Sequence, residues 1–162
     1  MSGRQRADGQ RGLTCSIARS LVVLGERWSL LIVREAFSGV TRFADFRAAL
    51  GVAPDVLTER LRTLVETGVL ERRPYREPGC RPRHDYHLTP AGRDLRLVLA
   101  ALQQWGDEHC PPPGGPSVVR RTGDGGRAVR VAFVDDADEV VPPERVRFER
   151  TAASVGRPAT AG

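Results

Sequence analysis

The sequence predicts a mainly α-helical fold with one small β-hairpin, followed by a small β-rich C-terminal extension. Apolar residues recur at helical spacing in four segments before residue 67, and again in a long segment at 91–109. Two short alternating segments on either side of "REPGCRPR" indicate two strands joined by a turn. The sequence "PPPGGP" at 111–116 then marks a break in the chain, which we interpret as a linker.

Three short helices are predicted in the first fifty residues. The first spans about 15–24 and is capped by Thr14 or Ser16. The second begins near Glu26, and its segment "WSLLIVREAF" is apolar on nearly every side, so we expect it to be the buried central helix. Thr41 is expected to cap the third helix, "RFADFRAAL", which ends at the following glycine.

A fourth helix at 54–67 follows the third after a tight turn. Pro54 suits the first helical position, because its missing N–H would be unpaired there anyway, and Gly68 ends the helix. The apolar stripe expected to pack inward consists of Leu57, Leu61, Leu64 and Val65. The opposite face carries Asp55, Glu59, Arg62 and Thr63, with Thr58 and Arg60 at its flanks. This face is either an ordinary solvated surface or one that reads base edges in the DNA major groove.

The hairpin that follows is strongly basic. From Arg72 to His84 there are five arginines and one glutamate, which gives a local charge of +4. Arginines placed on phosphates release condensed counterions and so give affinity for any nucleic acid. The alternative is that the charges merely protect an exposed sheet edge from aggregation. The formal net charge of the whole chain, +5, is compatible with an acidic partner.

The order of these elements is that of a winged helix-turn-helix. Two helices joined by a tight turn form the helix-turn-helix, the hairpin forms the wing, and a long helix follows. Arg42, at the start of the third helix, is placed where a phosphate meets both a guanidinium and a helix N-terminus. We therefore predict double-stranded DNA as the partner. The predicted DNA-binding residues are Arg42, Pro54, Asp55, Thr58, Glu59, Arg60, Arg62, Arg73, Arg81 and Arg83.

Two other classes of function are alternatives to DNA binding. A winged-helix module that binds another protein would use the acidic groups of the fourth helix as part of the contact. An enzyme is the weakest alternative, because no nucleophile motif, phosphate loop or glycine fingerprint is present. His84 and His87 are three residues apart on a strand, so they face opposite ways and are poorly placed to share a metal. No catalytic residue is predicted.

The long helix at 91–109 is apolar on two sides, and the first helix has a similar excess. We expect a homodimer through the helices at 15–24 and 91–109, which would present two fourth helices to a pseudo-palindromic DNA site. The alternative is that the C-terminal segment covers these apolar faces within one chain.

The predicted domain organisation follows from these signals. In chain order it is a disordered tail at 1–13, the winged helix-turn-helix and dimerisation domain at 14–110, the linker at 111–116, the β-rich extension at 117–150, and a second disordered tail at 151–162. Within the extension, "SVVRR" and "AVRVAFV" flank "TGDGG", which is typical of a hairpin.

The residues from Cys15 to about His109 resemble the HxlR-type winged helix-turn-helix regulators, relatives of the MarR group. The resemblance is carried by "CSIARSLVVLGERWSLLIVREAFSGVTRFADFRAAL", "VLTERLRTLVETGVLERR", "YHLTPAGRDL" and "QQWGDEH". It implies a dimeric transcription regulator with the fourth helix in the major groove and the first and last helices at the dimer interface. Ala53 departs from the family pattern, in which a serine often caps the fourth helix.

The resemblance also implies that Cys15 is a candidate redox or electrophile sensor. A helix N-terminus favours the thiolate form of a cysteine, which is the reactive form. The alternative is a small buried hydrophobe. A space between the dimer subunits, lined by Trp28, Phe37 or Trp105, could hold a small apolar effector, although such aromatic residues are more often part of a core.

The sequence predicts neither a cofactor nor a bound metal, since thiolate and imidazole ligands at suitable spacing are absent. No run of about 20 apolar residues is present, so no membrane span is expected. Three well-separated cysteines, Cys15, Cys80 and Cys110, favour a reducing cytoplasm as the location, and the resemblance implies a bacterial one.

Overall fold

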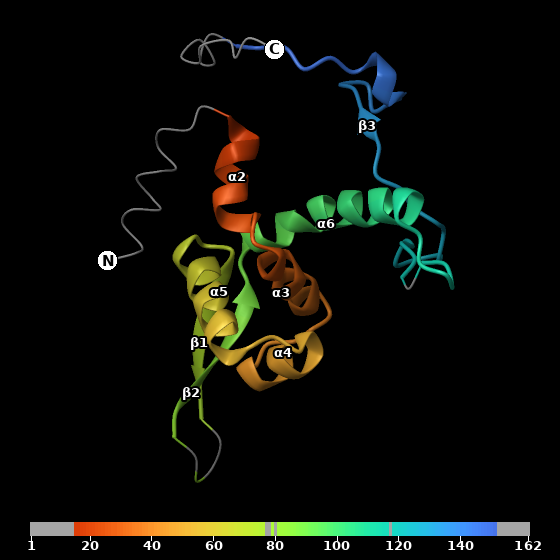
Figure 1. Cartoon of the computed structure of the whole chain (residues 1–162). Helices are drawn as coiled ribbons and strands as arrows, with labels where there is room; N and C mark the ends of the chain where they lie inside the picture. Colours follow the sequence, from red (N-terminus) through yellow and green to blue (C-terminus); the bar gives the residue numbers. More distant parts are fainter. Residues whose placement is uncertain (1–14, 77–78, 80, 117, 152–162) are drawn as a thin grey trace. The chain divides into compact units, whose positions relative to one another are not determined.

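The computed structural model describes residues 15–76, 79, 81–116 and 118–151 (Figure 1). These residues form two compact units, of which the first ends at Leu95 and the second spans 96–151. The tail expected at 1–13, nearly all of the tail expected at 151–162, and Cys80 lie outside the described residues. The predicted domain boundaries stay predictions.

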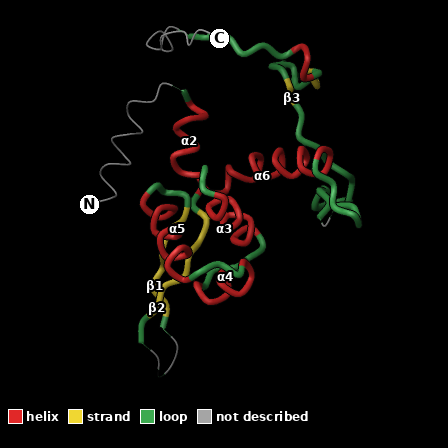
Figure 2. The backbone as a smooth tube through the Cα atoms, viewed as in Figure 1, coloured by secondary structure: helices red, strands yellow, loops and turns green. Residues whose placement is uncertain are grey.

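The elements follow the predicted order. They are α2 (Ser16–Leu24), α3 (Arg27–Phe37), α4 (Phe43–Leu50), α5 (Pro54–Glu66), β1 (Leu70–Tyr75), β2 (Arg83–Leu88) and α6 (Pro90–His109). The strands β1 and β2 pair antiparallel, with Leu70 opposite Leu88 and Tyr75 opposite Arg83. Helices, hairpin and long following helix together make a winged helix-turn-helix, as the sequence predicted (Figure 2).

The core of the first unit is small and is centred on α3, which packs against α4, α5 and β2. Its fully buried apolar side chains are Ile32, Val33, Phe46, Leu57, Leu61, Leu64 and Leu70. Helix α3 is central, as expected, but it is only partly buried: Ser29, Ile32 and Val33 are its buried residues. A domain of this size supplies neighbours for one side of its central helix and leaves the remaining apolar residues half-buried.

The third helix begins one residue later than predicted. Arg42, and not Thr41, occupies the N-cap of α4. The carbonyl of Thr41 accepts a hydrogen bond from the Tyr86 N–H at 2.8 Å, and Arg42 forms an isolated β-bridge with Asp85. Pairing with β2 therefore keeps residues 41–42 extended, and the helix starts only where that pairing ends.

The start of α6 is tied to the end of β2 and to the turn before β1. The Thr89 hydroxyl donates to the Gly68 carbonyl at 2.5 Å and accepts from the Gly92 N–H at 3.0 Å. Thr89 thus caps α6, and Gly68, with a φ of 74°, ends the preceding helix in the left-handed conformation that favours glycine. These bonds fix where the long helix leaves the first unit.

The second unit contains the C-terminal half of α6, the strand pair β3 (Phe133–Val134) and β4 (Val140–Val141), and the short 3-10 helix η1 (Pro143–Arg145). The hairpin expected around "TGDGG" is reduced to one bridge, between Arg121 and Ala128. The backbone of the expected strands is engaged elsewhere: the side chain of Gln103 donates to the Val118 carbonyl, and the side chain of Gln104 pairs with both backbone groups of Val131.

None of the helices in the described ranges combines the length and the apolar character needed to cross a membrane.

Candidate nucleic-acid interface

The two helices of the helix-turn-helix, α4 and α5, are joined by a three-residue turn. Gly51 adopts a φ of 60°, which lets the chain reverse at the end of α4, and Val52 is buried beneath the turn. Helix α5 then buries Leu57, Leu61 and Leu64 in the core. Because these three side chains fix the rotation of α5, its opposite face is turned away from the core.

The outward face of α5 differs from the predicted one in two positions. Thr63 was placed on this face, which was wrong: it is 3% exposed, and its hydroxyl donates to the Glu59 carbonyl at 3.0 Å. Arg60 has a side chain only 15% exposed, with its guanidinium 4.0 Å from the Glu59 carboxylate. Pro54, Asp55 and Thr58 are exposed. The accessible part of the face is therefore the first turn and the ridge that carries Glu59 and Arg62.

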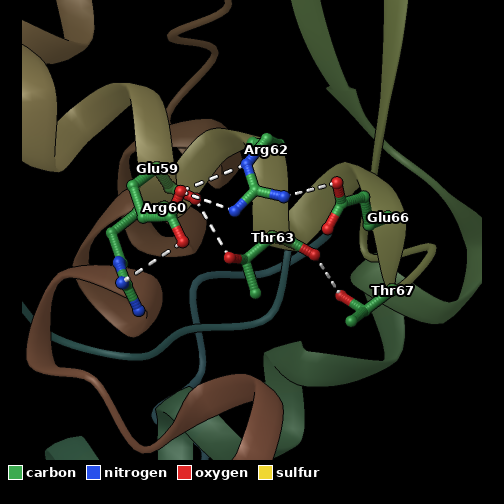
Figure 3. Close-up of polar contacts among 6 residues, drawn as sticks. All are labelled: Glu59, Arg60, Arg62, Thr63, Glu66 and Thr67. Carbon is green, nitrogen blue, oxygen red and sulfur yellow. Dashed lines mark hydrogen bonds and ion pairs between the residues drawn. The ribbon is translucent and has the colours of Figure 1, made fainter. Parts of the chain in front are cut away.

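On this ridge, Arg62 is held between two carboxylates (Figure 3). Its guanidinium lies 2.6 Å from Glu59 Oε2 and 2.6 Å from Glu66 Oε1. The hydrogen bond to Glu59, followed by the one to Glu66, raises the pKa of Arg62 above its ordinary value. Arg62 thus stays positively charged, and the two carboxylates fix the orientation of its guanidinium. Glu66 was missed in the sequence, although its spacing of four residues from Arg62 is that of a helical ion pair.

The wing is less uniformly basic than the count of arginines indicated. Arg73 is ion-paired with Glu71, and His87 lies 2.9 Å from Asp85. Both acids lie on the same face of the hairpin as Arg73, which stands opposite Asp85. Glu71 was missed because it immediately precedes the segment 72–84 that was counted. The base of the wing is therefore largely neutralised.

The outer part of the wing keeps its positive charge. Arg76, Arg81 and Arg83 are exposed, and none of them forms an ion pair with another described residue. The Arg42 guanidinium lies beside this part of the wing, because its carbon is 4.7 Å from the centroid of the Tyr75 ring. Tyr75 stands directly opposite Arg83 in the hairpin. The start of α4 and the outer wing thus bring these guanidinium groups to one side of the hairpin.

The N-terminus of α5 has no side-chain cap, in agreement with the departure noted at Ala53. Asp55 lies in the first turn, where a carboxylate is favoured by the helix dipole. A hydroxyl cap is worth about 1 kcal/mol, and a carboxylate in the first turn offsets part of that.

Cys15 occupies the N-cap of α2 and is exposed, as is Cys110. The alternative that Cys15 is a buried hydrophobe does not hold in the isolated chain. The guanidinium of Arg19, one turn further on, donates to the Ser16 hydroxyl at 2.9 Å. Within the described ranges, no three His, Cys, Asp or Glu side chains come together in a way that could hold a metal ion.

Large apolar side chains are exposed on two helices. On α2 these are Ile17 and Leu21, and on α6 they are Leu97, Val98, Leu102 and Trp105. No residue of α2 is buried, and only Gly92 of α6 is. Large apolar side chains exposed on a helix in this way are typical of an interaction site.

Comparison with known proteins agrees with this geometry. The family model described as "HxlR-like helix-turn-helix" matches residues 23–113, which include the helix-turn-helix, the wing and α6. The chain belongs to the HxlR-like helix-turn-helix family. It is 49% identical over 106 residues to an uncharacterized HTH-type transcriptional regulator of Mycobacterium tuberculosis, a match that covers 65% of this chain. The HxlR-like chain spans 66% of that relative's length.

Two solved structures extend the comparison. A proposed transcription factor named PA1607 matches with 36% identity and a TM-score of 0.77, over 88% of this chain and 99% of its own. That coverage reaches beyond the helix-turn-helix into the second unit. The redox regulator HypR, in its reduced form, matches with 27% identity and a TM-score of 0.54, over 59% of this chain and 94% of its own.

Proposed function

We propose that this HxlR-like protein is a homodimeric transcription regulator that binds pseudo-palindromic double-stranded DNA, with α5 in the major groove and the wing on the backbone or in the minor groove. The observation that carries the proposal is the common surface made by α5, Arg42 and the outer wing. A cationic surface beside an outward helix matches what DNA requires, namely phosphate contacts that set the orientation and side chains that reach base edges.

The first two turns of α5 are suited to base contacts. Asp55 and Glu59 can accept hydrogen bonds from cytosine amino groups, and the methyl of Thr58 can contact that of thymine. Arg62 supplies the paired donors that guanine accepts in the major groove. Pro54 and Arg60 flank this set, and the less exposed Arg60 contributes the least.

The dimer is supported by exposed apolar side chains, which are Ile17 and Leu21 on α2 and Val98 and Leu102 on α6. Burying them against a second copy would stabilise the dimer by roughly 25 cal/mol for each Å² of apolar area taken from water. A two-fold axis would repeat α5 at a second half-site about one helical turn of DNA away or a multiple of it, which is why the operator is expected to be pseudo-palindromic.

The wing gives the direct test of DNA binding. Arg81→Ala and Arg83→Ala are each expected to weaken binding to every DNA sequence alike, because each removes one phosphate contact. Each should also make the negative slope of log K against log salt shallower by about 0.9. The measurement is a titration of the intergenic DNA beside the protein's own gene at several salt concentrations, together with sedimentation of the free protein to establish the dimer.

Two matched variants separate this effect from a general loss of charge. Arg147→Ala removes an exposed arginine of the second unit and should leave the slope unchanged. Arg73→Ala should have a smaller effect than Arg83→Ala, because Glu71 already neutralises Arg73. If the wild-type protein shifts no DNA under any condition, the winged helix is better explained as a protein-binding module.

Cys15 is the proposed site of a response to oxidants. Its exposure at the N-cap of α2 favours a reactive thiolate, and HypR, a relative in structure, is a redox regulator. Diamide is expected to change operator binding by the wild-type protein and by Cys110→Ser, but not by Cys15→Ser. Equal responses from all three proteins would end the proposal.

A further inference from the structure

A hollow of about 570 Å³ lies within the second unit, between α6 and the segment around β3 and β4. This volume falls in the range of roughly 300–1,000 Å³ typical of small-molecule sites. The helix contributes Ala101, Gln104, Trp105 and Glu108, which recur at helical spacing and so define one face of α6. Residues 130–133 and 140–144 form the opposite wall.

Side-chain hydrogen bonds hold the two walls in place. The Gln104 amide donates to the Val131 carbonyl at 3.2 Å and its oxygen accepts from the Val131 N–H at 2.9 Å. The Asp135 carboxylate accepts from the N–H groups of Ala137 and Glu139, at 3.0 Å each, and closes the turn between β3 and β4. A ligand would therefore meet a largely formed site and would have little chain to order.

The walls are mainly apolar and include two aromatic rings. Trp105 is 60% exposed and Phe133 is 44% exposed, and Val140 and Pro142 add further apolar surface. Indole is the aromatic group that attracts a cation most strongly, through the negative face of its ring. An apolar ligand with a positive charge would satisfy both properties of this surface.

The charged side chains of the hollow favour the same class of ligand. Glu108 and Glu144 contribute two carboxylates and Arg130 contributes one guanidinium, which leaves a formal charge of −1. None of these three side chains forms an ion pair with another described residue. Their charge is thus available to a ligand, and its sign selects a cation.

We propose that this hollow binds an apolar organic cation with a single positive charge, which acts as the effector of the protein. Binding is argued from the second unit alone, whereas the effector role rests on the proposed function. Leu95, Val98 and Leu102 lie on a stripe of α6 roughly a quarter turn from the face that lines the hollow. Dimerisation through that stripe would leave the hollow open.

The test compares two probes of nearly identical shape and opposite charge. Tetraphenylphosphonium and tetraphenylborate are titrated into the full chain in a calorimeter at fixed ionic strength. The phosphonium is expected to bind saturably, about tenfold more tightly than the borate, because two partly exposed carboxylates together supply about that factor. Quenching of tryptophan fluorescence in Trp28→Phe, where Trp105 is the remaining tryptophan, reports the same event.

Four variants test whether the cation binds in the hollow, and a fifth serves as a control. Glu108→Gln and Glu144→Gln should each weaken phosphonium binding about threefold, and Arg130→Gln should strengthen it by a similar factor. Trp105→Leu should remove most of the affinity, whereas Glu149→Gln, an exposed carboxylate outside the hollow, should change nothing. Circular dichroism of each variant verifies that it folds.

The proposal is overturned if the borate binds as tightly as the phosphonium, if neither binds saturably, or if the four variants leave the affinity unchanged. Operator titrations with and without phosphonium test the effector role separately. Binding of the cation without any change in operator affinity removes the effector role. Failure of the protein to bind DNA with or without the cation removes the proposed function and leaves the calorimetric result standing.

Discussion

Gly92→Ala is expected to destabilise the protein by about 3 kcal/mol or more, a large part of the roughly 5–15 kcal/mol that stabilises a typical domain. A Cβ at this position would lie 2.1 Å from the Val69 carbonyl oxygen and 3.1 Å from Leu88 Cδ2. The first of these neighbours is backbone, which cannot swing aside as the end of a long side chain does. Relief requires that α6 move away from Val69, which immediately precedes β1.

Such a movement would break the hydrogen bonds that anchor α6. The Val69 carbonyl accepts from the Thr89 N–H at 3.1 Å, the Thr89 hydroxyl bonds to Gly68, and the Arg93 guanidinium donates to the Leu88 carbonyl at 2.8 Å. Each bond is worth about 1 kcal/mol, so overpacking and lost hydrogen bonds add together. Urea denaturation followed by circular dichroism measures the change.

Gly106→Ala provides the matched control for this prediction. Gly106 lies in the same helix, but nothing is within 4 Å of a Cβ built there. The same substitution should therefore be neutral or should stabilise the protein by up to about 1 kcal/mol, since alanine is the better helix former. Equal losses at positions 92 and 106 would mean that helix propensity, and not the approach of Val69, decides the effect.

The order of elements could be predicted from the sequence because it depends on local signals. Pro54 and Gly68 at the ends of α5, and the leucines spaced three and four residues apart, act within one helix and do not depend on the rest of the chain. Thr41 was expected to cap α4 for the same local reason. Pairing with Asp85 and Tyr86, more than forty residues away, overrode that signal.

The residue types of the candidate interface were predictable from the sequence, but which charged side chains face each other was not. Counting arginines located the wing, but only the register of β1 with β2 shows that Arg73 and Asp85 face each other. Thr63 was placed outside because a helical wheel with three leucines leaves its position at the border, where packing against neighbouring elements decides burial. The hollow beside Trp105 depends on contacts between Gln104 and Val131, which no local pattern indicates.

Arg62→Ala is expected to change which DNA sequence is preferred, more than it changes the affinity for DNA in general. Glu59 and Glu66 hold the guanidinium in one direction on the exposed face of α5. A preset guanidinium that bonds to a guanine discriminates against other bases by about 1–3 kcal/mol, a factor of roughly ten to a hundred. Selection from operators with a randomised half-site, for the wild type and the variant, measures the preference at each position.

Glu66→Gln is the informative partner for this variant. It removes one of the two carboxylates that pair with Arg62 and also one negative charge near the phosphates. It should therefore strengthen binding to all DNA sequences, while the preferred bases stay the same. Glu59→Gln should weaken the preference as well, since Glu59 accepts two hydrogen bonds from Arg62 and is itself placed to accept from a cytosine amino group. If Arg62 serves only as a helix ion pair, Arg62→Ala would cost a few tenths of a kcal/mol of stability and leave the selected sequence identical. The two roles therefore give opposite results in the selection and in the denaturation curve, and the pair of measurements decides between them.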